Sequence, residues 1–381
     1  MVGRRLGGLV LAAGLVAAAA GCGAGTMGAG GIAGTPVPAR GAPAGAGDTG
    51  GAGGGAGAGG RAGGGPSTSR AAGEIVLAFA GDVHFAERTA GLLAEPGTAF
   101  GPIAEVLSAA DLAVANLETA VTIRGTEQPK KYHFRAPPAA YEAVKAAGVD
   151  AVSVANNHTL DYGPVGLADT LSHAAAAGVP TFGAGAGAGQ AYAAWLTEVR
   201  GTRIALVGIS QVHELETTWN ATDERPGVAH ARDRARAVAA VRAARQRADL
   251  VAVFMHWGKE GSQCPTAEMK SFASAIADAG ADLIVGTHAH LLLGDGWLGG
   301  TYVAYGLGNF LWWWNDAYSN DTGVLRVTLR GGKIAGTELV PAHISRESGQ
   351  PLPATGAEAA RITAKFAALR ACTGLAATAP P

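Results

Sequence analysis

Apolar runs alternate with alanine-rich amphipathic stretches through the middle of the chain. Five short runs have the length and composition of buried strands: 75–80, 112–115, 151–154, 250–255 and 283–285. Five amphipathic stretches between or after them are typical of helices: 100–109, 138–147, 164–177, 231–247 and 266–279. This alternation predicts βαβ units and an α/β fold.

The pattern changes in two places. Residues 192–199 and 203–209 read as an antiparallel pair that turns at Arg200-Gly201-Thr202. Toward the end, 301–305, 323–330 and 333–339 read as strands, with a hairpin turn at Gly331-Gly332 and a last helix near 356–370. We therefore expect mixed sheets, partly parallel and partly antiparallel.

The first 73 residues differ from the rest. Arg4, Arg5 and the apolar run 9–20 predict a signal peptide over 1–22, which ends at Ala19-Ala20-Gly21-Cys22. That ending resembles a bacterial lipobox, with Cys22 as the lipidation site; plain secretion is the alternative. Residues 23–73 are nearly all Gly, Ala, Pro and Ser, and they predict a disordered linker that tethers the protein to a membrane.

The remaining chain predicts one large domain over 74–345, followed by a C-terminal helix and tail over 346–381. A net charge of −1 argues against nucleic acid as a partner. Cys264 and Cys372 are left once Cys22 is set aside, and in an exported protein they form either one disulfide or two free thiols.

Each predicted central strand ends in a polar cluster. The clusters are Gly81-Asp82-Val83-His84, Asn116-Leu117-Glu118, Asn156-Asn157-His158, His256-Trp257-Gly258 and Gly286-Thr287-His288-Ala289-His290. Asp, Glu, Asn and His are the ligands that divalent metals take, and the carboxyl ends of strands are where sites assemble in α/β sheets. The five clusters together predict a metal-dependent active site.

Spacing within the clusters indicates roles. Asp82 and His84 lie two residues apart after a strand, so both side chains can reach one metal, and His288 and His290 repeat this spacing. Glu118 is the carboxylate of the central clusters, either bridging two metals or paired with a surface cation.

Other cluster residues have roles beside the metals. Asn157 and His256 are candidate ligands, and Glu260 is either a supporting group or a surface charge. His158 is the candidate general acid, and Asp161 either orients its imidazole or caps the helix that follows.

Two aromatic segments concern the substrate. Lys130-Lys131-Tyr132-His133-Phe134-Arg135 is either a clamp for an anionic polymer, with Lys131 and Arg135 as its cations, or a solvated loop. Phe310-Leu311-Trp312-Trp313-Trp314 is either a stacking platform or core packing.

The ordered motifs Asp-x-His, Asn-x-Glu, Asn-Asn-His-x-x-Asp-x-Gly, His-Trp-Gly, Gly-x-His-x-His and Gly-Asn-Phe resemble the CapA family of capsule and poly-γ-glutamate biosynthesis proteins, within the calcineurin-like metallophosphoesterase superfamily. The resemblance implies a layered α/β/β/α sandwich and two divalent ions (Mn, Fe, Zn or Mg). It also implies ligand roles, which are Asp82, His84 and His290 on the first metal, Glu118 as the bridge, and Asn157, His256 and His288 on the second. His158 is then the proton donor, and Asn309 contacts substrate or stabilises a turn.

Two functions follow from this resemblance. The first is a two-metal hydrolase on the outer face of the cytoplasmic membrane, in which a metal-bound hydroxide attacks a phosphate ester or an amide link of an envelope polymer such as poly-γ-glutamate. The second is a non-catalytic accessory subunit that binds or anchors an anionic polymer during export, beside other capsule synthesis subunits. A glycosidase that uses Glu118 and Glu260 leaves the histidines without a role.

Overall fold

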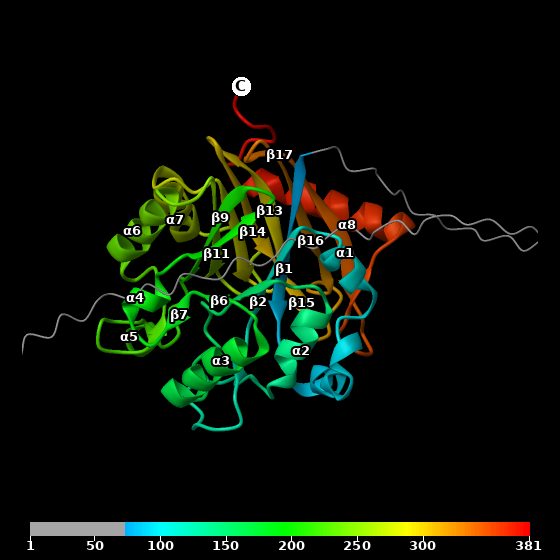
Figure 1. The fold of residues 1–381 in the computed structure, drawn as a ribbon. Coiled ribbons are helices and arrows are strands. Elements are labelled where there is room, and N and C mark those ends of the chain that lie inside the picture. Colours follow the sequence, from blue (N-terminus) through cyan, green and yellow to red (C-terminus); the bar gives the residue numbers. More distant parts are fainter. Residues whose placement is uncertain (1–72) are drawn as a thin grey trace, which may run out of the picture. The chain divides into compact units, whose positions relative to one another are not determined.

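Two β-sheets form the framework of residues 73–381, the part of the chain that the computed structural model describes (Figure 1). The expected signal peptide, Cys22 and nearly all of the expected linker lie outside the described residues. Within the described residues, no helix has the length and apolar character needed to cross a membrane.

The first sheet is mixed and has the strand order β18-β17-β16-β1-β2-β5-β6, with β15 also paired to β1. β1 runs parallel to β2 and β15 and antiparallel to β16. The strands are β1 (Glu74–Val83), β2 (Leu112–Leu117), β5 (Ala151–Ser153), β6 (Thr181–Phe182), β15 (Asn309–Leu311), β16 (Asp321–Arg330), β17 (Lys333–Ile344) and β18 (Pro351–Pro353).

The second sheet has the order β13-β14-β12-β11-β9-β8, parallel at its centre and antiparallel at both edges. Its strands are β8 (Trp195–Val199), β9 (Thr202–Ser210), β11 (Leu250–Trp257), β12 (Leu283–His288), β13 (Leu292–Leu298) and β14 (Thr301–Leu307). Two small ribbons pair β3 (Ala120–Val121) with β4 (Arg135–Ala136) and β7 (Ala184–Gly185) with β10 (Gly227–Val228).

Helices connect the strands. They are α1 (Ala104–Ser108), α2 (Ala139–Ala146), α3 (Gly163–Ala177), α4 (Ala188–Ala191), α5 (Glu216–Trp219), α6 (Arg234–Arg245), α7 (Ala267–Asp278) and α8 (Gly356–Leu369). Short 3-10 turns add η1 (Glu87–Ala94), η2 (Pro96–Thr98), η3 (Gly101–Ile103) and η4 (Arg370–Cys372).

Three apolar clusters define the layers. Leu77 and Phe79 of the first sheet pack with Leu206 and Phe254 of the second, so the two sheets face each other. The opposite face of the first sheet packs on α1, α2 and α3, and the opposite face of the second packs on α6 and α7. The predicted α/β/β/α sandwich with mixed sheets is confirmed.

Several element boundaries differ from the predicted ones for local reasons. The helix expected from residue 100 starts only at Ala104, because Gly101 has a φ of 60° and Pro102 follows it. The helix expected over 231–247 starts at Arg234, because the Asp233 side chain accepts a hydrogen bond from the backbone amide of Arg236. Residues 188–191 form α4, so β8 begins at Trp195 rather than at 192.

The C-terminal segment is part of the layered structure. β18 pairs with β17 at the edge of the first sheet, and α8 packs Ile362 and Phe366 against Leu292 of β13. A disulfide joins Cys264, in the loop after β11, to Cys372 of η4, with the two Cα atoms 5.7 Å apart. The last residues are therefore held to the second sheet by a covalent link as well as by packing.

Candidate metal centre

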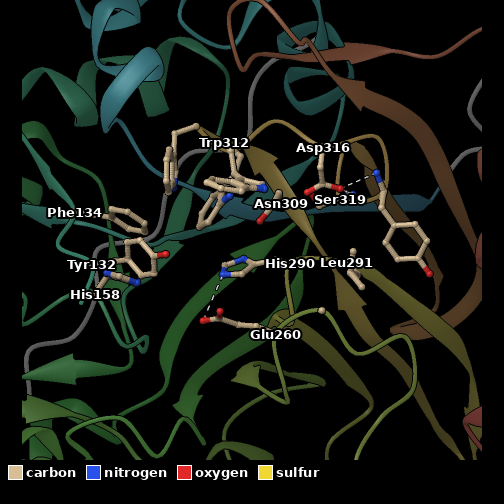
Figure 2. A pocket seen from close by; sticks show the side chains of 14 residues that line it. Tyr132, Phe134, His158, Glu260, His290, Leu291, Asn309, Trp312, Asp316 and Ser319 are labelled. Atoms are coloured by element: carbon tan, nitrogen blue, oxygen red, sulfur yellow. Dashed lines mark hydrogen bonds and ion pairs between the residues drawn. The ribbon is translucent and has the colours of Figure 1, made fainter. Parts of the chain in front are cut away.

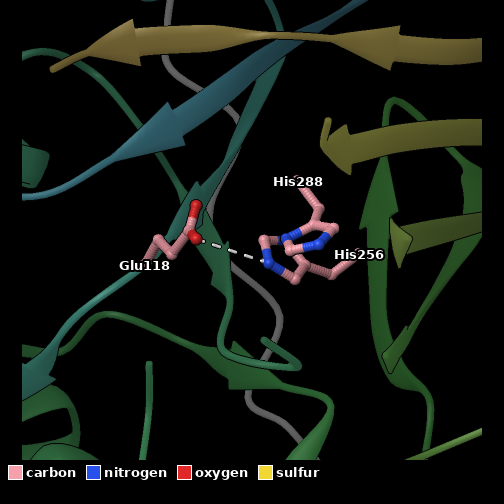
Figure 3. A group of neighbouring side chains, drawn as sticks. All are labelled: Glu118, His256 and His288. Atoms are coloured by element: carbon pink, nitrogen blue, oxygen red, sulfur yellow. Dashed lines mark ion pairs between the residues drawn. The ribbon is translucent and has the colours of Figure 1, made fainter. Parts of the chain in front are cut away.

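Two groups of potential metal ligands lie at the carboxyl ends of the central strands. Glu118, His256 and His288 form one group (Figure 3). Asp82, Glu118 and His290 form the other, and within each group all ligand atoms lie within 4.8 Å of one another. Glu118 belongs to both groups, and it follows β2 of the first sheet, whereas His256 and His288 end strands of the second sheet.

Ligand atoms in both groups are buried without hydrogen-bond partners among the described residues. These atoms are Glu118 Oε1, His288 Nδ1 and His290 Nδ1. Buried polar atoms are normally paired because an unmade hydrogen bond costs free energy. Imidazole nitrogens and carboxylate oxygens are the donors that Zn²⁺, Mn²⁺ and Fe²⁺ accept. The residues present therefore fit a divalent cation.

The electrostatics of the site also fit a cation. Burial, together with the negative charge of Asp82, raises the pKa of Glu118 well above its ordinary value. Burial lowers the pKa of His256 to about 3 and that of His288 well below its ordinary value. The imidazoles are thus neutral and free to ligate, and a bound cation would favour the ionised form of Glu118.

Asp82 is the carboxylate that stays ionised. Burial acts to raise its pKa, but the nearby imidazoles of His290 and His256 and the hydrogen bond from Asn116 outweigh it, so the pKa of Asp82 is lowered. Asp82 Oδ1 accepts a hydrogen bond from Asn116 Nδ2 at 2.8 Å, and Oδ2 accepts from the backbone amide of His288 at 3.0 Å. Asn116 therefore lies within the site, where it fixes a ligand.

Close backbone approach brings these ligands together. A Cβ at Gly81 would lie 2.0 Å from the carbonyl oxygen of Gly308, and one at Gly286 would lie 2.0 Å from that of Tyr305. His288 and His290 have φ angles of 84° and 60°, in the left-handed region that non-glycine residues rarely adopt. Backbone strain of this kind occurs at functional sites, where the surroundings fix it.

Asn157 lies beside the first group. Its Oδ1 atom is 2.7 Å from His256 Nε2, so both predicted ligands face the same space. Neighbouring Asn156 supports the arrangement, because its Nδ2 donates to Asn116 Oδ1 at 3.0 Å and its Oδ1 accepts from the backbone amide of His158.

His158 and Asp161 form a hydrogen-bonded pair next to Glu118. His158 Nδ1 lies 2.6 Å from Asp161 Oδ2, and His158 Nε2 lies 3.8 Å from Glu118 Oε1. The alternative role of Asp161 as a helix cap is wrong, because α3 begins at Gly163 after Tyr162 and has no side-chain cap. Burial lowers the pKa of His158 well below its ordinary value.

The structure adds Lys130, which the sequence interpretation placed in a substrate loop. Its Nζ atom lies 2.9 Å from Asp161 Oδ1 and 2.9 Å from Glu214 Oε2, and it donates to the backbone carbonyl of Asn157. The side chain is only 1% exposed. A fully buried lysine has a structural or chemical role. In the sequence, the only signal for Lys130 is the group of basic residues beside it.

His84 is not brought into either ligand group. Its Nδ1 atom faces the backbone amide of Ala86 at 3.1 Å, and its Nε2 faces that of Trp313 at 3.2 Å. Its ring stacks on Phe134, which also stacks on His158, with centroid distances of 4.3 and 4.0 Å. Loop amides engage both ring nitrogens, and the expected role of His84 as a metal ligand stays a prediction.

A pocket of about 400 Å³ opens beside the ligand groups (Figure 2). His158, His290 and Asn309 line it, and Asn309 Oδ1 is buried without a partner in the described part of the chain. Lys131 and Arg135 do not line this pocket.

The two cations proposed as a polymer clamp each pack on a tyrosine ring. The Arg135 guanidinium packs 3.4 Å from the centroid of the Tyr162 ring, and Lys131 Nζ lies 4.7 Å from that of the Tyr132 ring. Glu260 is 60% exposed, and its Oε1 lies 3.8 Å from His290 Nε2 at the pocket edge. Lys131 thus packs on a residue that lines the pocket and Arg135 does not, and the cationic clamp over 130–135 stays a prediction.

Comparison with known proteins gives consistent matches. Capsule biosynthesis protein CapA of Bacillus anthracis is 28% identical over 310 residues, which cover 77% of this chain and 72% of that protein. PGA biosynthesis protein CapA of Bacillus subtilis (strain 168) is 28% identical over 279 residues, which cover 72% and 73%. A probable polyglutamine synthesis accessory protein of Mycobacterium tuberculosis is 29% identical over 305 residues, which cover 74% and 80%.

Solved structures align less closely. A hypothetical protein from Thermus thermophilus aligns with a TM-score of 0.46 at 16% identity, over 73% of this chain and 100% of that chain. Because that score is low, the assignment rests on sequence. The family model of the bacterial capsule synthesis protein PGA_cap matches residues 76–312, which include both ligand groups, and the chain belongs to this family.

Proposed function

We propose that this protein is a metal-dependent hydrolase that cleaves phosphoester bonds in a cell-envelope polymer during capsule or poly-γ-glutamate synthesis. The observation that carries the proposal is Glu118, a buried carboxylate shared by two ligand groups whose other members are His256, His288, His290 and Asp82. A carboxylate between two such groups is the arrangement that a pair of divalent cations requires.

The ligand residues then divide between two cations. Glu118, His256, His288 and Asn157 would hold one cation, and Asp82, Glu118 and His290 would hold the other. Bound divalent cations polarise phosphoryl oxygens and lower the pKa of bound water.

His158 is the proton donor in this proposal, and Asp161 orients it. Because Nδ1 faces Asp161, Nε2 is the atom that gives its proton to the leaving group. The negative charge of a phosphate beside His158 would raise the pKa that burial lowers.

The test pairs metal analysis with hydrolysis of bis-p-nitrophenyl phosphate. His256→Ala should lose both bound metal and activity. His158→Asn should keep its metal and lose about 10²- to 10⁴-fold in rate, the usual contribution of a positioned acid. His213→Ala is the control, because His213 is 65% exposed and pairs with Glu216 and Glu268 outside the ligand groups.

Full activity in both site variants contradicts the proposal. Metal binding with no turnover of any phosphoester by the wild-type protein favours the accessory role instead, a role that the name of the Mycobacterium tuberculosis relative gives to that protein.

We further propose that the protein is exported and held at the outer face of the cytoplasmic membrane through Cys22. The support is the basic and apolar start of the chain and its lipobox-like ending at Cys22. Cell fractionation of the wild type and Cys22→Ser checks it. The wild type should sediment with membranes and incorporate labelled palmitate, and the variant should do neither. Wild-type protein in the cytoplasmic fraction contradicts the proposal.

A further inference from the structure

Exposed aromatic side chains gather at the mouth of the pocket beside the metal centre. Among the described residues, five large apolar side chains are exposed, and three of them, Tyr132, Trp314 and Tyr318, line this pocket. Together with Trp313 they form what we call the aromatic platform. Exposed apolar surface concentrated at one pocket marks a binding site rather than ordinary surface variation.

The tryptophan segment of the platform is held by a single guanidinium group. Arg88 donates hydrogen bonds from Nε to the carbonyl oxygen of Trp313 at 2.6 Å and from its Nη2 to those of Trp312 and Trp314 at 3.2 and 3.0 Å. Its Nη1 donates to the carbonyl oxygens of Ser345 and Arg346. Three successive tryptophans are thus fixed by their backbones, which lowers the entropy lost when a ligand binds.

The residues that line the pocket favour a neutral group at the platform over a row of carboxylates. The lining includes two carboxylates, Glu260 and Asp316, and neither lysine nor arginine. Two cations lie near the platform: Arg88, whose donors face carbonyl oxygens, and Lys131, whose Nζ lies 4.7 Å from the centroid of the Tyr132 ring. A chain of glutamate carboxylates would meet like charges here, whereas hydroxyl groups would meet acceptors, including the unpartnered Oδ1 of Asn309.

The angles between the rings favour a chair-shaped ligand over a flat one. The Trp313 and Trp314 rings meet at 78°, and the Tyr132 and Trp313 rings at 52°, with centroids 5.1 and 6.3 Å apart. These rings therefore do not form a parallel slot for a planar base. A pyranose ring has an apolar C–H face for one aromatic wall and hydroxyl groups around its edge.

We propose that the aromatic platform binds a hexopyranose ring, so that the substrate is a sugar-phosphate polymer whose phosphate lies at the ligand groups. This inference rests on the proposed function for the placement of the phosphate. His158 and His290 line the pocket and also contact the ligand groups, so adjacent sugar and phosphate units reach both regions together.

Binding without catalysis tests the inference. Isothermal titration calorimetry on protein in EDTA would use neutral tetrasaccharides of glucose, mannose and N-acetylglucosamine, with tetra-γ-glutamate and adenosine as comparison ligands. At least one tetrasaccharide should bind more tightly than either comparison ligand. Trp314→Ala should weaken that binding about tenfold, the upper range for one aromatic contact, and Trp314→Phe should restore most of it.

Ile123→Ala is the matched control, because Ile123 is 75% exposed and lies outside the pocket lining. Failure of all three tetrasaccharides to bind overturns the inference, as does tetrasaccharide binding that Trp314→Ala leaves unchanged or tighter binding of tetra-γ-glutamate. Because EDTA removes the cations, sugar binding remains measurable even where hydrolysis is absent. Phosphodiester hydrolysis without sugar binding would overturn this inference and leave the proposed function standing.

Discussion

Replacing Lys130 by methionine removes the cation that holds Asp161 in its buried position. The two side chains are 1% and 0% exposed, and Nζ lies 2.9 Å from Oδ1. Burial raises the pKa of Asp161 to about 7, although Lys130 and the backbone amide of Phe134 both act to lower it. Without Lys130 the carboxyl group has lost its strongest favourable charge, and it takes up a proton instead of staying ionised in the interior.

The magnitude follows from the distance between the pKa and the working pH. At pH 8, about one unit above the pKa of Asp161, the ionised form is favoured over the protonated form by about 1 kcal/mol. This is the coupling free energy that we expect between Lys130 and Asp161 at pH 8. At pH 6 Asp161 is mostly protonated, so the coupling should fall close to zero.

Urea unfolding of the wild type, Lys130→Met, Asp161→Asn and the double variant measures the coupling as a double-mutant cycle. All four proteins are compared in EDTA at pH 6 and pH 8. A coupling that is absent at pH 8, or equal at the two pH values, refutes the reasoning.

The pH dependence of the single variants is a second check. The folded pKa of Asp161 lies above its unfolded value, so its contribution lowers stability as pH rises from about 4 to 7. Asp161→Asn should remove this slope, and Lys130→Met should extend it to higher pH.

Three further predictions concern stability. In EDTA at neutral pH, Glu118→Gln should raise Tm, because the folded state holds a proton on Glu118 that the unfolded chain releases near the ordinary pKa. With saturating Mn²⁺ the variant should instead melt below the wild type. A variant Tm below that of the wild type in EDTA contradicts this. Cys264→Ser with Cys372→Ser opens a loop with a sequence separation of 108 and should cost about 2–4 kcal/mol in urea unfolding, so an unchanged midpoint contradicts it. Gly286→Ala should cost about 2 kcal/mol, because its Cβ meets a carbonyl oxygen at 2.0 Å, whereas Gly336→Ala meets nothing; equal stability of these two variants would argue against the close approach.

The polar residues at the strand ends could be predicted as metal ligands from the sequence, because the carboxyl ends of parallel strands lie at one edge of a sheet. Asp82, Glu118, His256 and His288 follow or end four different strands, and with His290 they form two groups whose ligand atoms lie within 4.8 Å of one another. The register of these strands is set by apolar residues that are visible as runs in the sequence.

Loop conformation could not be read in the same way. Lys130 reaches Asp161 across 31 positions, and Arg88 reaches Trp313 across 225, through loops whose paths no short-range pattern specifies. The contacts of His84 could not be predicted for the same reason, because its partner Trp313 belongs to a segment distant in the sequence. Buried polar contacts between loops are the part of the site that depends on the complete fold.

The two ligand groups combine side chains from both sheets, and this has a consequence for where the metal comes from. Asp82 and Glu118 lie at the ends of strands of the first sheet, and His256 and His288 at the ends of strands of the second. An unfolded chain holds no such arrangement, so the centre exists only after the sheets have docked. Under the export proposed above, the ions available outside the cytoplasm would then decide which metal the protein carries.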